Sequence, residues 1–364
     1  MDIITLFDKL LTFKSITPLD DGAFDFIESY MNGFEVKRLD FGDVKNLFLV
    51  KKFGDGEHLC FAGHIDVVPA GDGWDSDPFC PTRVGDKIVA RGTQDMKSGV
   101  AAFLNACKNA KDFSGTLSIL LTSDEEGDAI YGTVKVLEYL KNENLLPDFV
   151  VVAEPTCEKI FGDAIKIGRR GSINGVIEKM GIQGHAAYPE KAKNPIHKVA
   201  AVLPYMAGVN LDKGDANFAP SQFVITDIRA GMEVTNVTPG KLKMMFNVRN
   251  STKTDKKDVE NFVYRYFKDM DYILTLNQSA KPFVTNRNSK VVSLLADVIK
   301  DVTSVETKLS TAGGTSDARF FGEYGIDTVE FGVINDTIHA PNESTTVKEV
   351  KDLEKIFEKL IEKF

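Results

Sequence analysis

The chain lacks the cysteine pattern of a disulfide-stapled or zinc-ribbon protein. Its 364 residues include only four cysteines, Cys60, Cys80, Cys107 and Cys157, and no two of them form a CxxC pair. Zinc ribbons need paired cysteines at short spacing, and small secreted domains carry many more cysteines for their length. We therefore expect four reduced thiols and a cytoplasmic protein.

Long apolar runs and a positive net charge are absent as well. No stretch approaches the roughly 18 apolar residues that cross a membrane. The first 13 residues have the spacing of an amphipathic helix but lack the basic start and apolar core of a signal peptide. Forty-four basic against 53 acidic residues give a net charge of −9, which argues against nucleic acid as the main partner. We expect a small-molecule substrate and no membrane or nucleic-acid partner.

What the chain does have is a series of apolar segments that end in acidic residues or histidine. Apart from Ser118, residues 117–122 are apolar or β-branched, as is typical of a strand buried on both faces, and Asp124, Glu125 and Glu126 follow them. The comparable positions elsewhere are His64, Asp66, Asp95, Glu154 and His339. Ligands of open α/β sheets bind beyond the carboxyl ends of the strands, so we expect these side chains to converge.

The order of the expected elements divides the chain into two domains. In residues 1–171 and 286–364 strands alternate with helices, which predicts an α/β domain with a mainly parallel sheet and helices on both faces. Residues 172–285 follow the order strand-helix-strand-strand-helix-strand, the ferredoxin-like arrangement of an α+β domain. Pro204 should kink or shorten the helix expected at residues 195–209. We therefore expect a discontinuous catalytic domain that an inserted lid or dimerisation domain interrupts.

The residue types at the expected strand ends are those of a hydrolytic metal site. Carboxylates and imidazoles without thiolates suit zinc, cobalt or manganese. Two metal ions roughly 3.5–4 Å apart would share a bridging carboxylate and activate one water molecule. Each residue also has a simpler explanation, since Asp95 could cap the helix after it and His64 could be a core histidine. The agreement of so many strand ends favours the metal site.

Several motifs together resemble the family of co-catalytic di-zinc amidohydrolases, which includes aminoacylases and glutamate-releasing carboxypeptidases. The motifs are His64-Ile65-Asp66-Val67-Val68-Pro69, Trp74 with Pro78-Phe79, Arg91-Gly92 through Asp95-Met96-Lys97-Ser98-Gly99, Asp124-Glu125-Glu126-Gly127 and Ala153-Glu154-Pro155-Thr156. The resemblance spans almost the whole chain. It implies a zinc-peptidase-like fold and a metal-dependent hydrolase.

The same resemblance implies a role for each candidate residue. Two Zn²⁺ ions per subunit, with Co²⁺ or Mn²⁺ as possible substitutes, would be bridged by Asp95. The remaining ligands would be His64 and Glu154 for one metal and Glu126 and His339 for the other. Glu125 would act as general base and then general acid. Asp66 would orient His64 through the other ring nitrogen.

His185 lies in the domain that we expect to be inserted. The family resemblance implies a homodimer in which His185 reaches the site of the partner subunit and donates a hydrogen bond to the developing oxyanion. The alternative is a loop histidine that caps the following helix.

Three further segments resemble the desuccinylase branch of the family: Arg169-Arg170-Gly171-Ser172, Gly313 to Phe320, and Asn335 to His339. The resemblance implies hydrolysis of N-succinyl-LL-2,6-diaminopimelate to succinate and LL-2,6-diaminopimelate, a step of lysine and cell-wall precursor synthesis. Three substrate carboxylates require cationic and neutral donors. The candidates are Lys166, Arg169, Ser172, Tyr188, Asn236, Arg249, Thr315 and Asn335.

Three observations bear on the alternatives to this assignment. Ala340 and Pro341 follow His339, where many desuccinylases have a lysine and an apolar residue, so another N-acyl amino acid deacylase, such as one acting on N-acetylornithine, stays open. A dimeric binding protein without catalysis is disfavoured by the intact Glu125 and ligand set. Gly313-Gly314 is no phosphate-binding loop, because no Gly-Lys-Ser/Thr follows it.

Overall fold

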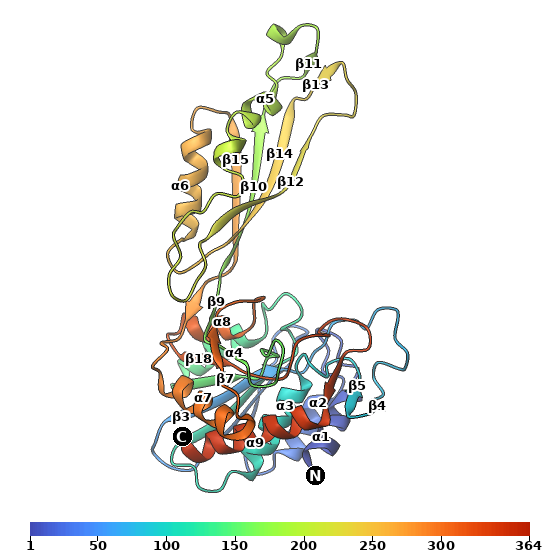
Figure 1. The fold of residues 1–364 in the computed structure, drawn as a ribbon, viewed down its shortest axis with the longest axis vertical. Helices are drawn as coiled ribbons and strands as arrows, with labels where there is room; N and C mark the ends of the chain where they lie inside the picture. Colours follow the sequence, from blue (N-terminus) through green and yellow to red (C-terminus); the bar gives the residue numbers. More distant parts are fainter. The chain divides into compact units, whose positions relative to one another are not determined.

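The computed structural model describes all 364 residues and divides them into two compact units (Figure 1). Unit 1 comprises Met1–Gly168, Val284–Ser310 and Ser316–Phe364, and unit 2 comprises Arg169–Phe283 and Thr311–Thr315. These bounds lie within a few residues of the predicted junctions at 171/172 and 285/286. Thr311–Thr315 groups with unit 2, which the sequence did not predict.

Unit 1 is built on an eight-stranded sheet with helices packed against it. Its helices are α1 (Ile3–Leu11), α2 (Ala23–Tyr30), α3 (Lys97–Asn109), α4 (Thr133–Asn142), α7 (Lys290–Thr303), α8 (Ala318–Glu323) and α9 (Val347–Lys363). The strands of the large sheet are β1 (Glu35–Arg38), β2 (Asn46–Lys52), β3 (His58–His64), β6 (Thr116–Thr122), β7 (Phe149–Val152), β8 (Ala164–Lys166), β17 (Lys308–Ser310) and β18 (Asp327–Glu330). A small sheet contains β4 (Thr82–Val84), β5 (Lys87–Val89) and β19 (Ser344–Thr346).

The large sheet has the order β1-β2-β6-β3-β7-β18-β8-β17. Its centre, β6, β3, β7 and β18, is parallel, as the apolar runs predicted. The sheet as a whole is mixed, since β1, β2 and β8 pair antiparallel to a neighbour. All residues of β3 and β6 after the first are buried, which explains why their sequences show no alternation of apolar and polar residues.

Helices cover both faces of this sheet. The chain runs from β3 through α3 to β6, and then from β6 through α4 back past β3 to β7. Because parallel crossovers are right-handed, connections in opposite directions place α3 and α4 on opposite faces. Helix α3 packs with α1 and α9, whereas α4 packs with α8 (Figure 1). The prediction of helices on both faces is confirmed.

Unit 2 follows the predicted ferredoxin-like order. Its main elements are β10 (Ser172–Met180), α5 (Pro195–Ala200), β12 (Gln222–Ala230), β14 (Lys241–Arg249), α6 (Lys256–Phe267) and β15 (Tyr272–Ala280). The four strands form an antiparallel sheet of order β12-β14-β10-β15. Helix α5 ends at Ala200 and a 3₁₀ turn at Leu203–Tyr205 contains Pro204, so the expected shortening of the helix by this proline is confirmed.

Short elements complete unit 2 and the chain crossings. They are the 3₁₀ turn Pro189–Lys191, the paired strands β11 (Gly184–His185) and β13 (Val237–Thr238), and the paired strands β9 (Gly168–Arg169) and β16 (Phe283–Val284). The core lies between the sheet and its helices, where the ring centroid of Phe223 is 4.2 Å from that of Phe246 and 5.2 Å from that of Phe262. A Cβ at Gly175 would lie 2.0 Å from the Phe246 ring, so only glycine leaves room for this ring over β10.

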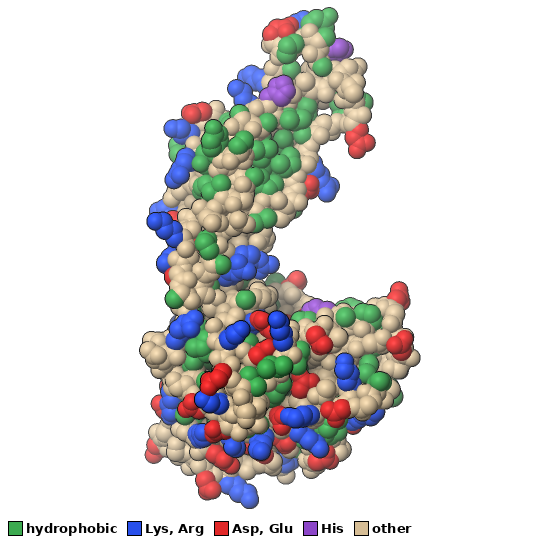
Figure 2. Space-filling view, viewed as in Figure 1, with side chains coloured by type: hydrophobic (Ala, Val, Ile, Leu, Met, Phe, Trp, Pro, Cys, Tyr) green, Lys and Arg blue, Asp and Glu red, His purple; other side chains and the backbone are tan.

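The opposite face of the unit 2 sheet has no helix of that unit on it. Its exposed apolar side chains include Val224, Met245 and Ile273. Figure 2 shows hydrophobic side chains gathered on unit 2, whereas charges of both signs are interspersed over the visible surface of unit 1. No helix of the protein combines the length and hydropathy needed to span a membrane.

Candidate metal centre

The parallel strands of unit 1 bring the predicted residues to one edge of the sheet. His64 ends β3, Glu125 and Glu126 follow β6, and Glu154 follows β7. Asp95 lies two residues before α3. It does not cap that helix, whose N-cap is Met96 without a side-chain hydrogen bond, so the simpler explanation of Asp95 is wrong.

His64 lies at the centre of one group of donors. Its Nε2 is 3.2 Å from Asp95 Oδ1, 3.7 Å from Glu154 Oε1 and 3.9 Å from Glu125 Oε2. His64, Glu125 and Glu154 can each offer an atom to a single cation, and so can His64, Asp95 and Glu126. The position of Glu125 is therefore compatible with two roles, that of a metal ligand and that of a general base.

His339 lies on the other side of Asp95. Its Nε2 is 3.2 Å from Asp95 Oδ2 and 2.9 Å from Glu126 Oε1. The two carboxylate oxygens of Asp95 thus face one histidine each, which is the arrangement that a bridging carboxylate requires. The loop that holds His339 turns sharply there, since φ of this residue is +59°.

Asp66 holds both His64 and the glutamate pair. Nδ1 of His64 lies 2.9 Å from the backbone carbonyl oxygen of Asp66 and 3.6 Å from its Oδ1. A proton on Nδ1 would leave the Nε2 lone pair available to a metal ion that the carboxylates bind. The carboxylate of Asp66 also accepts the backbone N–H groups of Glu125 at 3.4 Å and Glu126 at 3.1 Å. This second task was not apparent from the sequence.

The electrostatics show an excess of buried negative charge. Burial raises the pKa of Glu125 and Glu154 well above the usual range, and the neighbouring carboxylates, Asp95 among them, add to the effect. Burial opposes a charge on His64, but contacts with Asp66 and Asp95 raise its pKa. Hydrogen bonds that His339 donates to the carboxylates of Asp95 and Glu126 raise its pKa to about 10. Both imidazoles are therefore in a field that attracts cations.

This donor set fits two divalent metal ions. Four carboxylates and two imidazoles converge, and no thiolate lies among them. Gathering so many carboxylates out of water costs free energy unless cations neutralise them. Oxygen and imidazole ligands suit zinc, manganese or cobalt in a hydrolytic site. The residues present are therefore those that a dinuclear metal centre needs.

Close packing of α3 against β7 supports this geometry. An added Cβ at Gly99 would lie 2.4 Å from the carbonyl oxygen of Ala153. Only glycine lets the first turn of α3 approach the end of β7 so closely. Because Asp95 precedes this turn and Glu154 follows Ala153, the contact fixes the separation of two candidate ligands.

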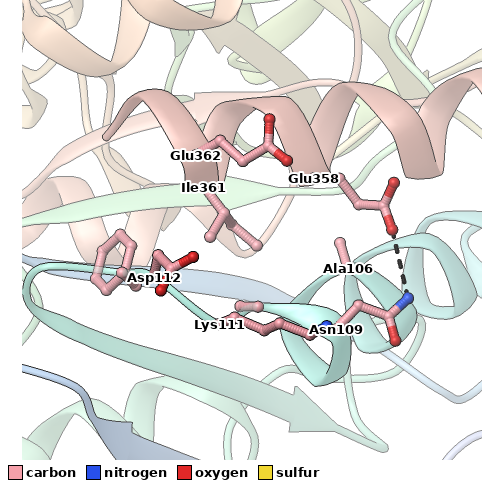
Figure 3. Close-up of a pocket in the computed structure, with 9 residues that line it drawn as sticks. Ala106, Asn109, Lys111, Asp112, Glu358, Ile361 and Glu362 are labelled. Atoms are coloured by element: carbon pink, nitrogen blue, oxygen red, sulfur yellow. Dashed lines mark hydrogen bonds between the residues drawn. The ribbon is translucent and has the colours of Figure 1, made fainter.

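The hollow drawn in Figure 3 is a different feature. It has a volume of about 350 Å³ and lies between the last turn of α3 and α9, with Asn109, Lys111, Glu358 and Ile361 among its lining residues. Asn109 is at the far end of the 13-residue helix α3 from Asp95, which corresponds to about 20 Å at 1.5 Å per residue. No histidine lines it, so it belongs to surface packing and not to the metal centre.

A family model described as peptidase family M20/M25/M40 matches residues 60–363. The chain belongs to peptidase family M20/M25/M40. A curated relative from Nautilia profundicola, named succinyl-diaminopimelate desuccinylase, is 66% identical over 364 residues and covers 100% of both chains. The fold agrees with that of an aminopeptidase PepT from Bacillus cereus, at a TM-score of 0.82 with 21% identity over 99% of this chain and 97% of that one.

A third similarity concerns the metal centre of the family. The Bacillus subtilis protein YXEP, described as a dinuclear metal binding peptidase from the M20 family, has a TM-score of 0.73 at 14% identity, over 99% of this chain and 96% of that one. The M20 fold thus carries dinuclear metal sites in at least one relative.

The predicted substrate residues are distributed between the two units. Lys166 and Asn335 lie in unit 1, and the other six lie in unit 2. Lys166 is buried and its Nζ is 3.3 Å from Glu158 Oε1. In unit 2, Arg169 is buried and donates to the carbonyl oxygen of Ala312 at 3.2 Å.

The other unit 2 residues range from buried to exposed. Ser172 is buried and accepts a hydrogen bond from Asn247, whereas Tyr188, Asn236 and Arg249 are exposed. Thr315 is partly buried. Their contact with a substrate stays a prediction.

Sequence reasoning missed three residues that organise the M20 centre. Arg91, Gln94 and Glu343 are fully or almost fully buried beside the loops of Asp95 and His339. The sequence did hold one indication of their importance, because they lie in the same motifs as Asp95 and His339. Nothing in the local pattern showed that Glu343 contacts a segment about 250 residues earlier.

Proposed function

We propose that the chain hydrolyses N-succinyl-LL-2,6-diaminopimelate to succinate and LL-2,6-diaminopimelate, a step of lysine and cell-wall precursor synthesis. The observation that carries this assignment is the 66% identity, over the full length of both chains, to a curated succinyl-diaminopimelate desuccinylase. The buried cluster of carboxylates and imidazoles supplies the chemistry that amide hydrolysis needs.

The centre would hold two metal ions per subunit, and we propose Zn²⁺, with Co²⁺ or Mn²⁺ as substitutes. Asp95 would bridge them, since its two oxygens face His64 and His339. Glu154 would complete the site of His64, and Glu126 the site of His339. When bound, these ions would polarise the amide carbonyl and lower the pKa of a water molecule.

Glu125 is the residue that moves the proton. Its Oε2 lies at the centre, 3.9 Å from His64 Nε2, and its burial raises its pKa, so the carboxylate is a stronger base than an exposed glutamate. It accepts a proton from the attacking water and delivers it to the nitrogen of the leaving amine, while the carbonyl carbon keeps the water oxygen. Asp66 keeps Glu125 in place through its backbone N–H.

We further propose a homodimer in which His185 serves the site of the partner subunit. His185 is exposed at the edge of unit 2. Its Nδ1 lies 3.1 Å from the backbone N–H of Ala187 and accepts this hydrogen bond, which leaves a proton on Nε2. That N–H can donate to an oxyanion.

Hybrid dimers test this trans assignment. His185→Ala subunits mixed with Glu125→Ala subunits should regain activity, because one site of each hybrid then has both residues. A His185→Ala subunit mixed with a subunit that carries both substitutions should stay inactive. Verified hybrids of the first kind without activity would show that His185 does not act in the partner's site.

The substrate candidates fit a molecule with three carboxylates. Arg169 and Arg249 have planar guanidinium groups, which can form bidentate hydrogen bonds with carboxylates. Replacement of either by lysine should raise KM for the succinyl substrate more than it lowers kcat.

We also propose a cytoplasmic location. The four cysteines form no disulfide, which fits a reducing compartment.

The decisive experiment is an assay of protein that has been stripped of metal and then reloaded with Zn²⁺. N-succinyl-LL-diaminopimelate and N-acetylornithine are offered separately, and loss of each amide is followed. We expect zinc-dependent turnover that strongly favours the succinyl substrate. Preference for the acetyl substrate would overturn the substrate but keep the metal chemistry, and no turnover of either by zinc-loaded protein would overturn the function.

A further inference from the structure

The carboxylate of Glu343 is buried next to the loop that carries Asp95. Its Oε1 accepts the backbone N–H groups of Gln94 at 2.7 Å and Asp95 at 3.1 Å, and its Oε2 accepts that of Gly92 at 3.1 Å. The side chain has no exposed surface. Three backbone donors of one turn thus meet a single buried carboxylate, which fixes the main chain of Asp95.

Arg91 connects the same carboxylate to the loop of His339. Its Nη1 lies 2.6 Å from Glu343 Oε2 and donates to the carbonyl oxygen of Ala340 at 3.3 Å. Its Nη2 donates to the carbonyl oxygen of His339 at 3.3 Å. The guanidinium is itself 1% exposed, so this ion pair lies in a medium where loss of one partner is costly.

The side chain of Gln94 forms hydrogen bonds with residues before and after His339 in its loop. Its Nε2 donates to Asp336 Oδ1 at 2.6 Å and to the carbonyl oxygen of Ser344 at 2.8 Å, and its Oε1 accepts the N–H of Thr337 at 2.9 Å. Because the backbone of Gln94 is held by Glu343, all these contacts depend on one carboxylate.

We propose that Glu343 is a positioning residue of the metal centre, which holds Asp95 through the turn at residues 92–95 and His339 through Arg91. This inference rests on the metal centre of the proposed function and not on the choice of substrate. It explains how a carboxylate that touches no candidate ligand side chain keeps the two oxygens of Asp95 directed at two different histidines.

The change Glu343→Gln tests this role without altering the size of the side chain. An amide keeps one acceptor oxygen but turns an NH₂ group toward backbone and guanidinium donors. Asp95 is shared by both metal sites, so Glu343→Gln should weaken both Zn²⁺-binding events. We expect the two dissociation constants, measured by calorimetry on metal-free protein, to rise about 10- to 100-fold with the stoichiometry unchanged.

A matched control is available in unit 2. The carboxylate of Asp212 also fixes a loop, since it accepts the N–H groups of Gly214 at 2.7 Å and Ser221 at 3.2 Å and the hydroxyl of Thr254 at 2.6 Å. Asp212→Asn should lower the Tm of the metal-free protein but leave both dissociation constants unchanged. The Co²⁺-loaded Glu343→Gln protein should have an altered visible absorption spectrum, whereas the spectrum of Asp212→Asn should match that of the wild type.

A second variant keeps the proposal testable if Glu343→Gln does not fold. Arg91→Lys retains a positive charge beside Glu343 but cannot also reach the two carbonyl oxygens of Ala340 and His339. Arg91→Lys should weaken mainly the binding of the Zn²⁺ ion that His339 would ligate. The variant His339→Ala, which removes that ligand, identifies this binding event in the calorimetry. Wild-type affinities in the folded variants, or equal losses in Asp212→Asn, would overturn the positioning role, and failure of the wild type to bind two Zn²⁺ would instead overturn the metal centre.

Discussion

The sheets of the two units differ in what their faces meet. In unit 1, strands such as β3 and β6 are buried on both sides, and polar groups gather where the strands end. In unit 2, β14 alternates between exposed and buried residues along its length, since helices cover only one face. A two-sided sheet leaves its strand ends as the place for chemistry. A one-sided sheet leaves a whole face free for a partner.

The largest expected effect belongs to the strand ends of unit 1. Glu125→Ala should lower kcat about 10²- to 10⁴-fold, because in the proposed mechanism Glu125 moves the proton. The same variant should still bind two Zn²⁺ ions, which calorimetry or metal analysis would measure. Loss of one ion would make Glu125 a metal ligand, a role that its distance from His64 and Glu154 also allows.

A core substitution in unit 2 should separate the stabilities of the two units. Phe246→Ala removes a ring from the core and should cost about 3–5 kcal/mol. Trp74, the single tryptophan, lies in unit 1, so its fluorescence reports unit 1 while circular dichroism reports the whole chain. In urea, we expect the dichroism signal of Phe246→Ala to show two separate unfolding transitions. The fluorescence signal should show one transition, at the wild-type urea concentration. Phe61→Ala in unit 1 is the control, and a common shift of both signals in Phe246→Ala would show that the units unfold together.

The residues of the metal centre should also make the stability of the metal-free protein depend on pH in the alkaline range. The pKa of His339 is raised to about 10 by Asp95 and Glu126. Because the folded value exceeds the unfolded value of about 6.5, this stabilisation is complete below pH 6.5 and is lost as the pH rises toward 10. The Tm difference between wild type and His339→Gln should therefore be largest near pH 6 and vanish near pH 10. A difference that is constant with pH would contradict the assignment.

The smallest effect on folding is expected at the open face of unit 2. Replacement of Val224 and Met245 by threonine should change the stability of a subunit by no more than about 0.5 kcal/mol each. If this face joins two subunits, light scattering should show dissociation at concentrations where the wild type is dimeric. Lys256→Thr, on helix α6, is a control that should leave the dimer intact. An unchanged dimer in the double variant would place the interface elsewhere.

The sequence predicted those features that depend on local pattern. The ferredoxin-like order of unit 2 was readable because the alternation of β14 and the spacing of α6 are local signals. The helix expected at residues 195–209 is shortened, as Pro204 predicted, but the apolar spacing did not show that it would end at Ala200. The direction of β2 was not readable, because a buried strand has the same apolar run in a parallel or an antiparallel pair.

The sequence by itself determined which residue types stand at the strand ends and to which family the chain belongs. Only the tertiary structure decided that the oxygens of Asp95 face different histidines. It also decided that Asp66 holds the backbone of the glutamate pair and that Glu343 holds a turn 248 to 251 residues earlier. The physical reason is that strand-end position follows from local hydrophobicity, whereas a hydrogen bond between distant segments exists only after the sheet has brought them together.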